Sequence, residues 1–553
     1  MAKAKLKNKS HPKKAAAPGG KQPKPVSNSP AVPQPLPQIK PETGPIRRIA
    51  AIDIGANSIR MVIAEATPAG KIDILERLQR TVHLGQDTFR RGRLSVPIMR
   101  AAIAILRDYR KLLDFYKVEE LRAVATSSVR EAANADTFID RVLMATEIEV
   151  EVIDTSEESR LTVSAVKRAL AGSTAGARDF VLIADVGGGS TLLTMLEKGE
   201  IAFAQSLRLG SIRLQESLLT ANDSPARLAE ILRHQIANVV ATGQHSLPMH
   251  QAEVFVAVGG DARFAARQVG RDLPGGDLAK IEGGDFTELV RHCTGRSAEN
   301  LARAYGINNA EAETLGPALL VYQALLAETR ARALIVAQVT MRDGLLLELA
   351  RAATGPEDPA ILEGILHSTL ALAEKYRIDL DHARQVARLA VRLFDELKAE
   401  HGLSPRDRIL LQAAALLHEA GLFVSGRAHH KHSYYLIANS EIFGLSREEL
   451  LVVALTARYH RRSSPKPTHL EYMALPREQR MRVSKLAALL RVADALDAAH
   501  AAQVSEIRAE RAGEELVLHL AAADLAMERR SVALKGDLFA DIFGLRLRLE
   551  EAK

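Results

Sequence analysis

Two stretches of this sequence decide its fold, and they share one pattern. Residues 49–75 read IAAIDIGANSIRMVIAEATPAGKIDIL, and residues 180–204 read FVLIADVGGGSTLLTMLEKGEIAFA. Each begins with an apolar strand that ends in Asp, continues through a Gly-rich turn with Ser, and adds a second strand and a second turn at Gly. Asp53 and Asp185 are the matching positions. A repeat of this length predicts two similar α/β lobes, each with a mixed sheet that opens with a β-hairpin.

The segments around the repeat predict the limits of the domains. Helical and strand periodicity alternate between the two copies, which is typical of α/β layers. GSTAGAR at 172–178 predicts a hinge, and ATGPEDP at 353–359 predicts a linker. We therefore expect lobe I at 46–174, lobe II at 175–352 and a helical domain at 356–553.

The first 45 residues differ in composition from the rest of the chain. They hold nine lysines, one acidic residue and ten of the 22 prolines. Their charge is thus +8, and because the whole chain carries +7, the other 508 residues carry −1. This composition predicts a disordered basic tail, with contact to a polyanion as the alternative and nucleic acid as an unexpected partner.

Cysteine usage and hydropathy limit the class of protein. Cys293 is the single cysteine, so a disulfide within the chain is excluded and a reducing, cytoplasmic setting is expected. No apolar run approaches the 18 or so residues of a membrane helix. We expect a soluble protein that does not contact a membrane.

The two Gly-rich turns carry candidate phosphate-binding groups. A strand that ends in Asp-x-Gly, followed by small polar residues, presents N–H groups that can hold phosphate oxygens. Because an Asp beside a phosphate is repulsive without a cation, Asp53 and Asp185 facing one cleft predict bound Mg²⁺. Two ordinary Asp-initiated turns are the alternative, which the duplication disfavours. The expected donors are Gly55, Asn57, Ser58, Gly187, Gly188, Gly189, Ser190 and Thr191.

These motifs also resemble a known family. DIGANS, DVGGGST and VAVGGDA resemble the phosphate motifs and the later Gly-Gly motif of the actin-like ATPase superfamily. More closely, AAIDIGANSIRMVIAE, VATSSVREAAN, VIDTSEESRL, IADVGGGST and LRLGSIRL resemble the exopolyphosphatase/guanosine pentaphosphate phosphatase (Ppx/GppA) family, from about residue 48 to near the C-terminus. The resemblance implies two actin-like (ribonuclease H-like) lobes around a phosphate site. It also implies removal of terminal phosphate from polyphosphate or pppGpp with Mg²⁺, and a homodimer.

The resemblance assigns the general base to Glu158. This residue matches the second Glu of the family's Glu-Glu motif, which orients or deprotonates the attacking water. Phosphoryl transfer needs such a group, because most of its catalysis is positioning and charge stabilisation. The local alternative is structural, since Thr155-Ser156-Glu157-Glu158 is also a good capping box at the start of a helix.

Metal and phosphate contacts follow from the same match. Asp185, with Asp53 opposite, is the expected Mg²⁺ residue. Arg60 and Arg130 are expected to contact phosphate oxygens, with surface ion pairing as the alternative. In the family's exopolyphosphatases a Glu that helps hold the metal commonly follows GGGST, and here that position is Leu192. Leu192 aligns with Arg60 in the repeat, so we expect it to face the cleft, and its apolar side chain puts metal affinity and turnover in question.

The C-terminal region resembles an HD-type phosphohydrolase domain, in which His, His-Asp and Asp residues hold divalent metals. Glu419 stands where that pattern has Asp. The domain is generally regarded as non-catalytic in the Ppx/GppA family, and structural histidines are commoner than metal ligands. The candidate residues are His382, His418, His429, His430, His432, His460 and Asp494. The preferred function here is a positive groove that guides long polyphosphate, formed by Arg458, Arg461, Arg462 and Lys466.

The leading prediction is therefore a Mg²⁺-dependent exopolyphosphatase that releases terminal orthophosphate from polyphosphate. One alternative is a pppGpp 5′-phosphohydrolase, which would share every motif. Another is a catalytically weakened sensor that binds polyphosphate or guanosine nucleotides, which Leu192 would explain. An actin-like ATPase or sugar kinase is disfavoured by Glu157-Glu158 and by the helical appendage.

Overall fold

The computed structural model describes residues 46–67, 71–217, 223–244, 247–352, 359–461, 463–521 and 525–551. The basic tail expected at 1–45 lies outside these residues and stays a prediction. Among the described residues, none of the helices combines the length and the apolar composition needed to cross a membrane.

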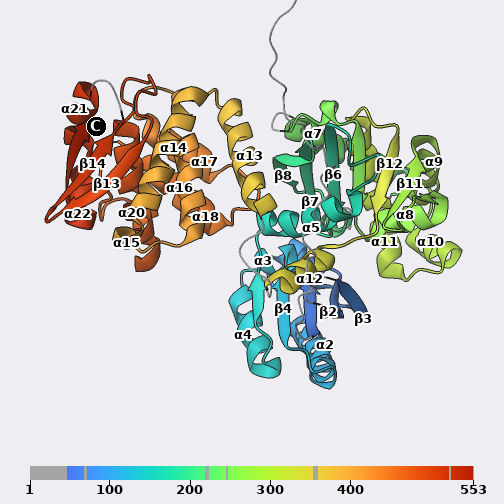
Figure 1. The fold of residues 1–553 in the computed structure, drawn as a ribbon. Coiled ribbons are helices and arrows are strands. Elements are labelled where there is room, and N and C mark those ends of the chain that lie inside the picture. Colours follow the sequence, from blue (N-terminus) through green and yellow to red (C-terminus); the bar gives the residue numbers. More distant parts are fainter. Residues whose placement is uncertain are drawn as a thin grey trace, which may run out of the picture. The chain divides into compact units, whose positions relative to one another are not determined.

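The first sheet holds the first copy of the repeat (Figure 1). Its strand order is β3-β2-β1-β4-β5, with β1 antiparallel to β2 and parallel to β4. One face of the sheet packs on α2 and α4. The strands are β1 (Arg47–Ile54), β2 (Ser58–Ala66), β3 (Ile72–Thr81), β4 (Glu120–Ala125) and β5 (Val150–Val152), and the helices that follow them along the chain are α1 (Leu84–Arg91), α2 (Val96–Phe115), α3 (Ser127–Arg130), α4 (Ala135–Thr146) and α5 (Thr155–Leu170).

The second sheet has the strand order β10-β11-β12-β9-β6-β7-β8. Its strands β8-β7-β6-β9-β12 repeat the order of the first sheet, and β6 pairs antiparallel with β7 and parallel with β9. The two copies therefore share one topology, as the sequence predicts. The strands are β6 (Phe180–Val186), β7 (Thr191–Glu197), β8 (Glu200–Leu207), β9 (Val254–Val258), β10 (Arg271–Asp272), β11 (Leu278–Glu282) and β12 (Ala333–Ala337).

One face of the second sheet is covered by helices from its own part of the chain. Apolar residues of α7, α8, α9 and α11 form a core with β6, β7 and β9. The helices of this part are α6 (Ser211–Ser217), α7 (Pro225–Gln244), α8 (Gly260–Val269), α9 (Gly283–Thr294), α10 (Ala298–Tyr305), α11 (Asn309–Ala327) and α12 (Met341–Ala352).

The other face of each sheet is covered by a helix that the chain order assigns to the opposite lobe. Val163, Val166 and Leu170 of α5 pack on the second sheet. Leu345 and Leu346 of α12 pack on the first sheet (Figure 1). Since each helix hides its apolar stripe where an uncovered sheet face is available, the two lobes exchange helices.

This exchange changes two expectations drawn from the sequence. The boundary between 46–174 and 175–352 does not separate two packing units. α5 precedes the boundary but packs on the second sheet, and α12 follows it but packs on the first sheet. The hinge expected at 172–178 is wrong, because the residues before and after it, Leu170 and Val181, belong to one apolar core. A Gly- and Ser-rich stretch also suits a simple helix-to-strand turn, which is its place here.

The C-terminal region has a large helical core of its own. It is not all-α, because β13 (Ile507–Ala512), β14 (Glu515–Leu520) and β15 (Arg546–Glu551) form a three-stranded sheet with β15 parallel to β14. Its helices are α13 (Pro359–Lys375), α14 (Leu380–Glu396), α15 (Lys398–His401), α16 (Pro405–Leu417), α17 (His429–Ala438), α18 (Arg447–Arg458), α19 (Leu470–Met473), α20 (Arg477–Ala495), α21 (Ala526–Lys535) and α22 (Asp537–Phe543).

Candidate active site

The two Gly-rich turns close in the same way. Gly55 N donates to the carbonyl oxygen of Ser58 at 3.1 Å, and Gly187 N donates to the carbonyl oxygen of Ser190 at 2.9 Å. A Cβ on Gly188 would lie 2.9 Å from the Cβ of Ala56 in the other turn. Gly188 is therefore required for the close approach of the two hairpins.

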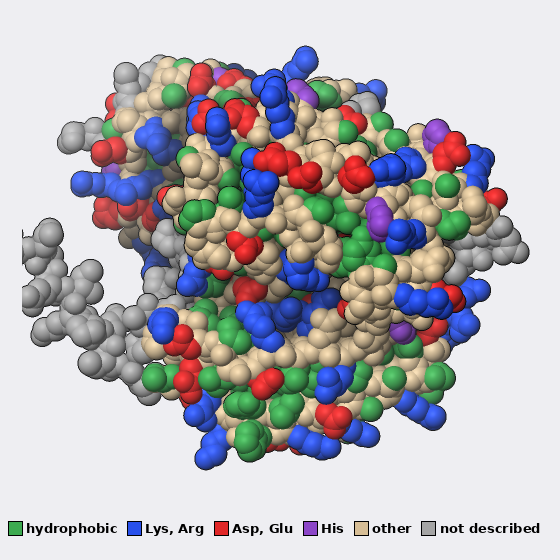
Figure 2. All heavy atoms as spheres, turned by 90° about the vertical axis from the view of Figure 1, so that its right-hand side faces the viewer, with side chains coloured by type: hydrophobic (Ala, Val, Ile, Leu, Met, Phe, Trp, Pro, Cys, Tyr) green, Lys and Arg blue, Asp and Glu red, His purple; other side chains and the backbone are tan. Residues whose placement is uncertain are grey.

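A cavity of about 400 Å³ opens where the two turns meet. Figure 2 shows a face that is hollowed across its middle, where blue Lys and Arg side chains gather. Parts of the turns, the start of α5 and the β9–α8 connection contribute to the wall. The predicted residues that line it are Asp53, Gly55, Asn57, Ser58, Arg60, Glu158, Asp185, Gly187, Gly188, Gly189 and Ser190.

Glu158 reaches this cavity because a cap fixes the first turn of α5. The N-cap residue is Asp154, whose side chain accepts a hydrogen bond from Glu157 N at 2.8 Å. The expected capping box at Thr155–Glu158 is therefore displaced by one residue, because the N-cap is Asp154 and not Thr155. Asp at the N-cap satisfies an otherwise unpaired N–H group and favours the helix dipole.

The environment of Glu158 changes its acidity. Burial raises the pKa of Glu158 to about 7, the guanidinium of Arg130 opposes this rise, and the carboxylates of Asp185 and Asp53 add to it. Arg130 holds its Nη atoms 3.5 Å from Glu158 Oε2. A carboxyl group that titrates near neutrality can accept a proton from water, as a general base must.

Asp53 and Asp185 differ in their partners. Asp53 Oδ2 lies 3.5 Å from Arg60 Nη1 and 3.3 Å from Arg342 Nη1. Asp185 accepts a hydrogen bond from Thr162 Oγ1 at 3.3 Å, and within the part of the chain that the structure describes it has no Lys or Arg within ion-pair distance. Burial raises the pKa of Asp185. Its half-buried carboxylate therefore fits a divalent cation, whereas two arginines already neutralise Asp53.

Three residues singled out from the sequence do not line the cavity. Arg130 donates to the carbonyl oxygen of Ile153 at 2.6 Å and faces Glu158 rather than the cavity. The hydroxyl of Thr191 is fully buried and donates to the carbonyl oxygen of Leu209 at 2.7 Å. Leu192 pairs with Asp185 as Arg60 pairs with Asp53, so the alignment of the repeats is confirmed. Its side chain is only 5% exposed, however, and lies in the interior.

Comparison with known proteins agrees with this geometry. The model of the Ppx/GppA phosphatase family matches residues 62–353, and the model of Ppx/GppA phosphatase domain III matches residues 366–533. The chain belongs to the Ppx/GppA phosphatase family.

The solved structures similar to this Ppx/GppA protein match about half of the chain. A structure described as an exopolyphosphatase from Cytophaga hutchinsonii ATCC 33406 is 21% identical, covers 55% of this chain and 98% of that chain, and has a TM-score of 0.51. A Ppx/GppA family member from Aquifex aeolicus is 26% identical, covers 56% of this chain and 100% of that chain, and has a TM-score of 0.47. The actin-like fold expected from the sequence is confirmed for the two lobes.

Sequence reasoning missed three charged residues of the Ppx/GppA cavity. Burial raises the pKa of Asp261 to about 7, while Arg263 and Arg60 oppose that rise. Burial lowers the pKa of Arg342 to about 10 and also lowers the pKa of Arg263. Asp261 lies within the motif VAVGGDA and Arg263 follows it directly, so this motif is a signal that could have found both residues. Arg342 comes from the start of α12, and no local pattern marks it.

Gly259 explains why that motif needs glycine. Its φ is +128°, a backbone conformation that residues with a side chain rarely adopt. An added Cβ would lie 2.8 Å from Tyr322 Oη and 3.1 Å from the carbonyl oxygen of Val186. The β9–α8 connection can therefore pass close to the end of β6 and place the N-terminus of α8 at the cavity.

The C-terminal region of the Ppx/GppA chain holds a separate cluster of buried donors. His382, His418 and Asp494 place one ligand atom each within 4.8 Å of one another. The Nδ1 atoms of the two histidines face Asp497 Oδ2 and the carbonyl oxygen of Ala415, both at 2.7 Å. Their Nε2 atoms are buried without a hydrogen-bond partner among the described residues and lie 3.8 and 3.9 Å from Asp494 Oδ1. These atoms could hold a divalent metal ion, although Lys535 already contacts the other oxygen of Asp494 at 2.6 Å.

Proposed function

We propose that this protein is a Mg²⁺-dependent exopolyphosphatase that removes terminal orthophosphate from inorganic polyphosphate. The observation that carries the proposal is Glu158, a half-buried carboxyl group with a pKa of about 7 that lines one cavity together with both phosphate turns. Membership of the Ppx/GppA phosphatase family supports the reaction class. An exopolyphosphatase description belongs to the Cytophaga hutchinsonii protein, whose low identity makes it evidence for the fold alone.

Each group has a role in the proposed reaction. The N–H groups of the two turns would hold the terminal phosphoryl oxygens. Arg60, Arg263 and Arg342 would offset the charge of the transferring group and its neighbours. Glu158 would orient a water molecule and take its proton. Mg²⁺, when bound, would neutralise phosphate charge, and the oxygens of Asp185 are the donors that fit it.

Polyphosphate suits the cavity better than a guanosine nucleotide. Arginine supplies most of the cationic surface of the wall, which matches a linear polyanion. A guanine base needs an apolar or aromatic surface on which to stack, and among the described lining residues the single aromatic side chain is Phe264. The pppGpp 5′-phosphohydrolase remains the second candidate because the same turns would hold its terminal phosphate.

One assay tests the proposal. We expect orthophosphate release from long polyphosphate with Mg²⁺ and little release after chelation. Release from pppGpp alone would make the nucleotide phosphatase the function, and release from ATP alone would overturn the assignment. No release from any of the three would favour a polyphosphate- or nucleotide-binding regulator. A homodimer is part of the proposal, and light scattering after size-exclusion chromatography tests it.

A further inference from the structure

We propose that Asp154 is a positioning residue that ties the first turn of α5, and with it Glu158, to the N-terminus of α18 and the loop that precedes it. The inference rests on the proposed role of Glu158 in the cleft. It assigns the C-terminal region a direct part in placing the reactive carboxyl group.

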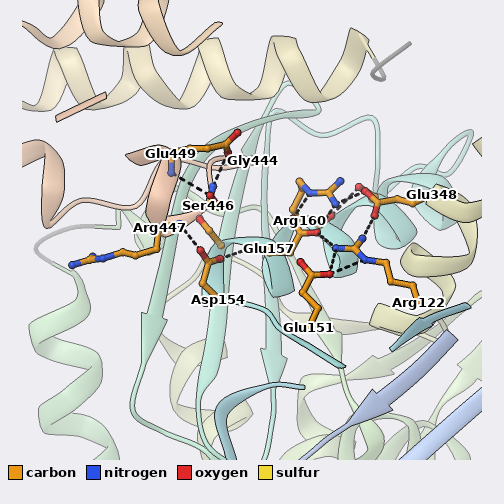
Figure 3. A network of polar contacts seen from close by, with 12 residues as sticks. Arg122, Glu151, Asp154, Glu157, Arg160, Glu348, Gly444, Ser446, Arg447 and Glu449 are labelled. Carbon is orange, nitrogen blue, oxygen red and sulfur yellow. Dashed lines mark hydrogen bonds and ion pairs between the residues drawn. The ribbon is translucent and has the colours of Figure 1, made fainter. Parts of the chain in front are cut away.

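One carboxylate joins the N-termini of two helices (Figure 3). Asp154 Oδ1 accepts the hydrogen bond from Glu157 N at 2.8 Å. Asp154 Oδ2 accepts a hydrogen bond from the backbone N–H of Arg447. Arg447 is the first residue of α18, so this N–H has no partner within its own helix. The carboxylate thus satisfies two helix ends that are 293 residues apart in the sequence.

The same loop has further contacts with α5 and its surroundings. Ser156 Oγ donates to the carbonyl oxygen of Ile442 at 3.3 Å. Phe443 packs in the apolar core that α5 forms with the second sheet, and its N–H donates to Ser368 Oγ at 3.2 Å. The loop is therefore fixed beside the first turn of α5.

The other side of the loop is also held. Ser446 and Glu449 form a complete capping box at the start of α18. The guanidinium of Arg406 contacts the two carboxylate oxygens of Glu449 at 2.7 and 2.8 Å and also the carbonyl oxygen of Gly444. Because these contacts fix the loop, the N–H of Arg447 is presented to Asp154 in a set position.

On its opposite side, the first turn of α5 is anchored by Glu157. Glu157 pairs with Arg122 at 2.9 Å and with Arg160 at 2.7 Å, and both arginines also pair with Glu348 of α12 (Figure 3). The first turn is therefore held by Glu157 on the lobe side and by Asp154 on the C-terminal side. Glu158 directly follows Glu157 in this turn and lines the cavity.

Two variants of Arg447 isolate the bond. Arg447→Pro removes the N–H together with the arginine side chain and should leave the start of the helix intact, because Pro is favoured at the first position of a helix and Ser446 already has the extended conformation that precedes Pro (φ −67°, ψ 163°). Arg447→Ala is the matched control, since it removes the side chain and keeps the N–H. Asp154→Ser is a second variant, because Ser still caps α5 but has one oxygen where two are needed.

We expect Arg447→Pro and Asp154→Ser to lower kcat by roughly tenfold with KM nearly unchanged, because small misplacements of a reacting group are costly. The acid limb of the kcat profile should also move, since Glu158 faces Arg130 of α3, Asp185 of β6 and Asp53 of β1. Arg447→Ala should stay within twofold of the parent. Hydrogen exchange should increase over residues 155–160 in the first two variants only.

The outcomes separate this inference from the proposed function. If Arg447→Pro matches Arg447→Ala in kcat, pH profile and hydrogen exchange, the inference is overturned. If the parent releases no phosphate from any substrate, the proposed function fails, and the exchange measurement still decides whether Asp154 holds α5. Should Arg447→Pro fail to fold, Asp154→Ser carries the same comparison.

Discussion

Glu158 is a carboxyl group in a place where its charged form is poorly solvated. Burial raises its pKa to about 7, and only Arg130 among the principal causes opposes the rise while Asp185 and Asp53 add to it. Both protonation states are therefore populated near neutral pH. Substitution of Glu158 or Arg130 should therefore change phosphate release, the pH dependence of stability or the pH profile of activity.

Glu158→Gln should remove most phosphate release and leave polyphosphate binding nearly intact. Gln keeps the size of the side chain but cannot take a proton, and a positioned base contributes about 10²–10⁴-fold. Single-turnover phosphate release measures the first effect, and a binding titration measures the second. Turnover within a factor of two of the parent would mean that Glu158 is a structural residue of the first turn of α5.

The same variant should change how stability depends on pH. The folded-state pKa lies above the ordinary value of 4.5, so the stability that the protonated form contributes is present below about pH 4.5 and is lost as pH rises through about 7. Glu158→Gln should therefore melt at a higher temperature than the parent at pH 8, with the difference shrinking toward pH 5. Equal differences at both pH values would show that the buried charge is not the cause.

Arg130→Met should move the acid limb of the activity profile to higher pH. Removal of the guanidinium leaves the carboxylate of Glu158 without its nearest favourable charge, so its pKa should rise further. Because the carboxylate is the active form, half-maximal kcat is then reached at a higher pH. Arg130→Lys keeps the charge and serves as the control, and a profile unchanged in Arg130→Met would contradict the pairing.

At the scale of the strand, β7 shows how a register can be correct while a functional inference from it fails. Leu192 pairs with Asp185 as the sequence alignment requires, yet it is buried in the interior and lines no part of the cavity. The side chain of Arg60, at the matching position of β2, does line the cavity. Strand pairing determines on which face of the sheet a side chain lies. The elements packed on that face determine which of its side chains remain exposed.

Leu192→Glu should therefore destabilise the protein rather than improve its metal site. A carboxylate buried on the same face as Asp185 loses solvation and gains a repulsive neighbour. We expect a drop of several degrees in melting temperature with no reduction in the Mg²⁺ concentration for half-maximal activity. Leu192→Met is the apolar control. A stable Glu variant with a lower Mg²⁺ requirement would restore the cleft-facing interpretation.

Local patterns predicted the hairpins and turns because each of them depends on residues that are close in sequence. Asp53, Gly55 and Ser58 form one turn, and the second copy repeats it, so their place at the cavity could be expected. Arg342 could not, because it reaches Asp53 across 289 residues and only after α12 has packed on the first sheet. The exchange of helices is likewise a property of uncovered sheet faces, which no window of sequence contains.

At the scale of the whole molecule, the exchange predicts that the first lobe does not fold alone. Residues 46–174 contain the first sheet but lack α12, and they carry α5 without the second sheet that covers Val163, Val166 and Leu170. We expect this fragment to be aggregated or to lack a cooperative melting transition. Residues 46–352 should melt as one unit, as measured by circular dichroism and calorimetry. A cooperatively folded 46–174 fragment would contradict this prediction.

The exchange also has a consequence for the growing chain on the ribosome. All strands of the first sheet are synthesised before α6 begins, but the helix that closes their second face, α12, leaves the exit tunnel only after the whole second sheet has been made. Throughout that interval Ile49, Ala51 and Val62 lack the cover that α12 gives them in the folded protein. Nascent chains stalled before residue 341 should therefore recruit holding chaperones, and chains stalled well beyond residue 352 should release them.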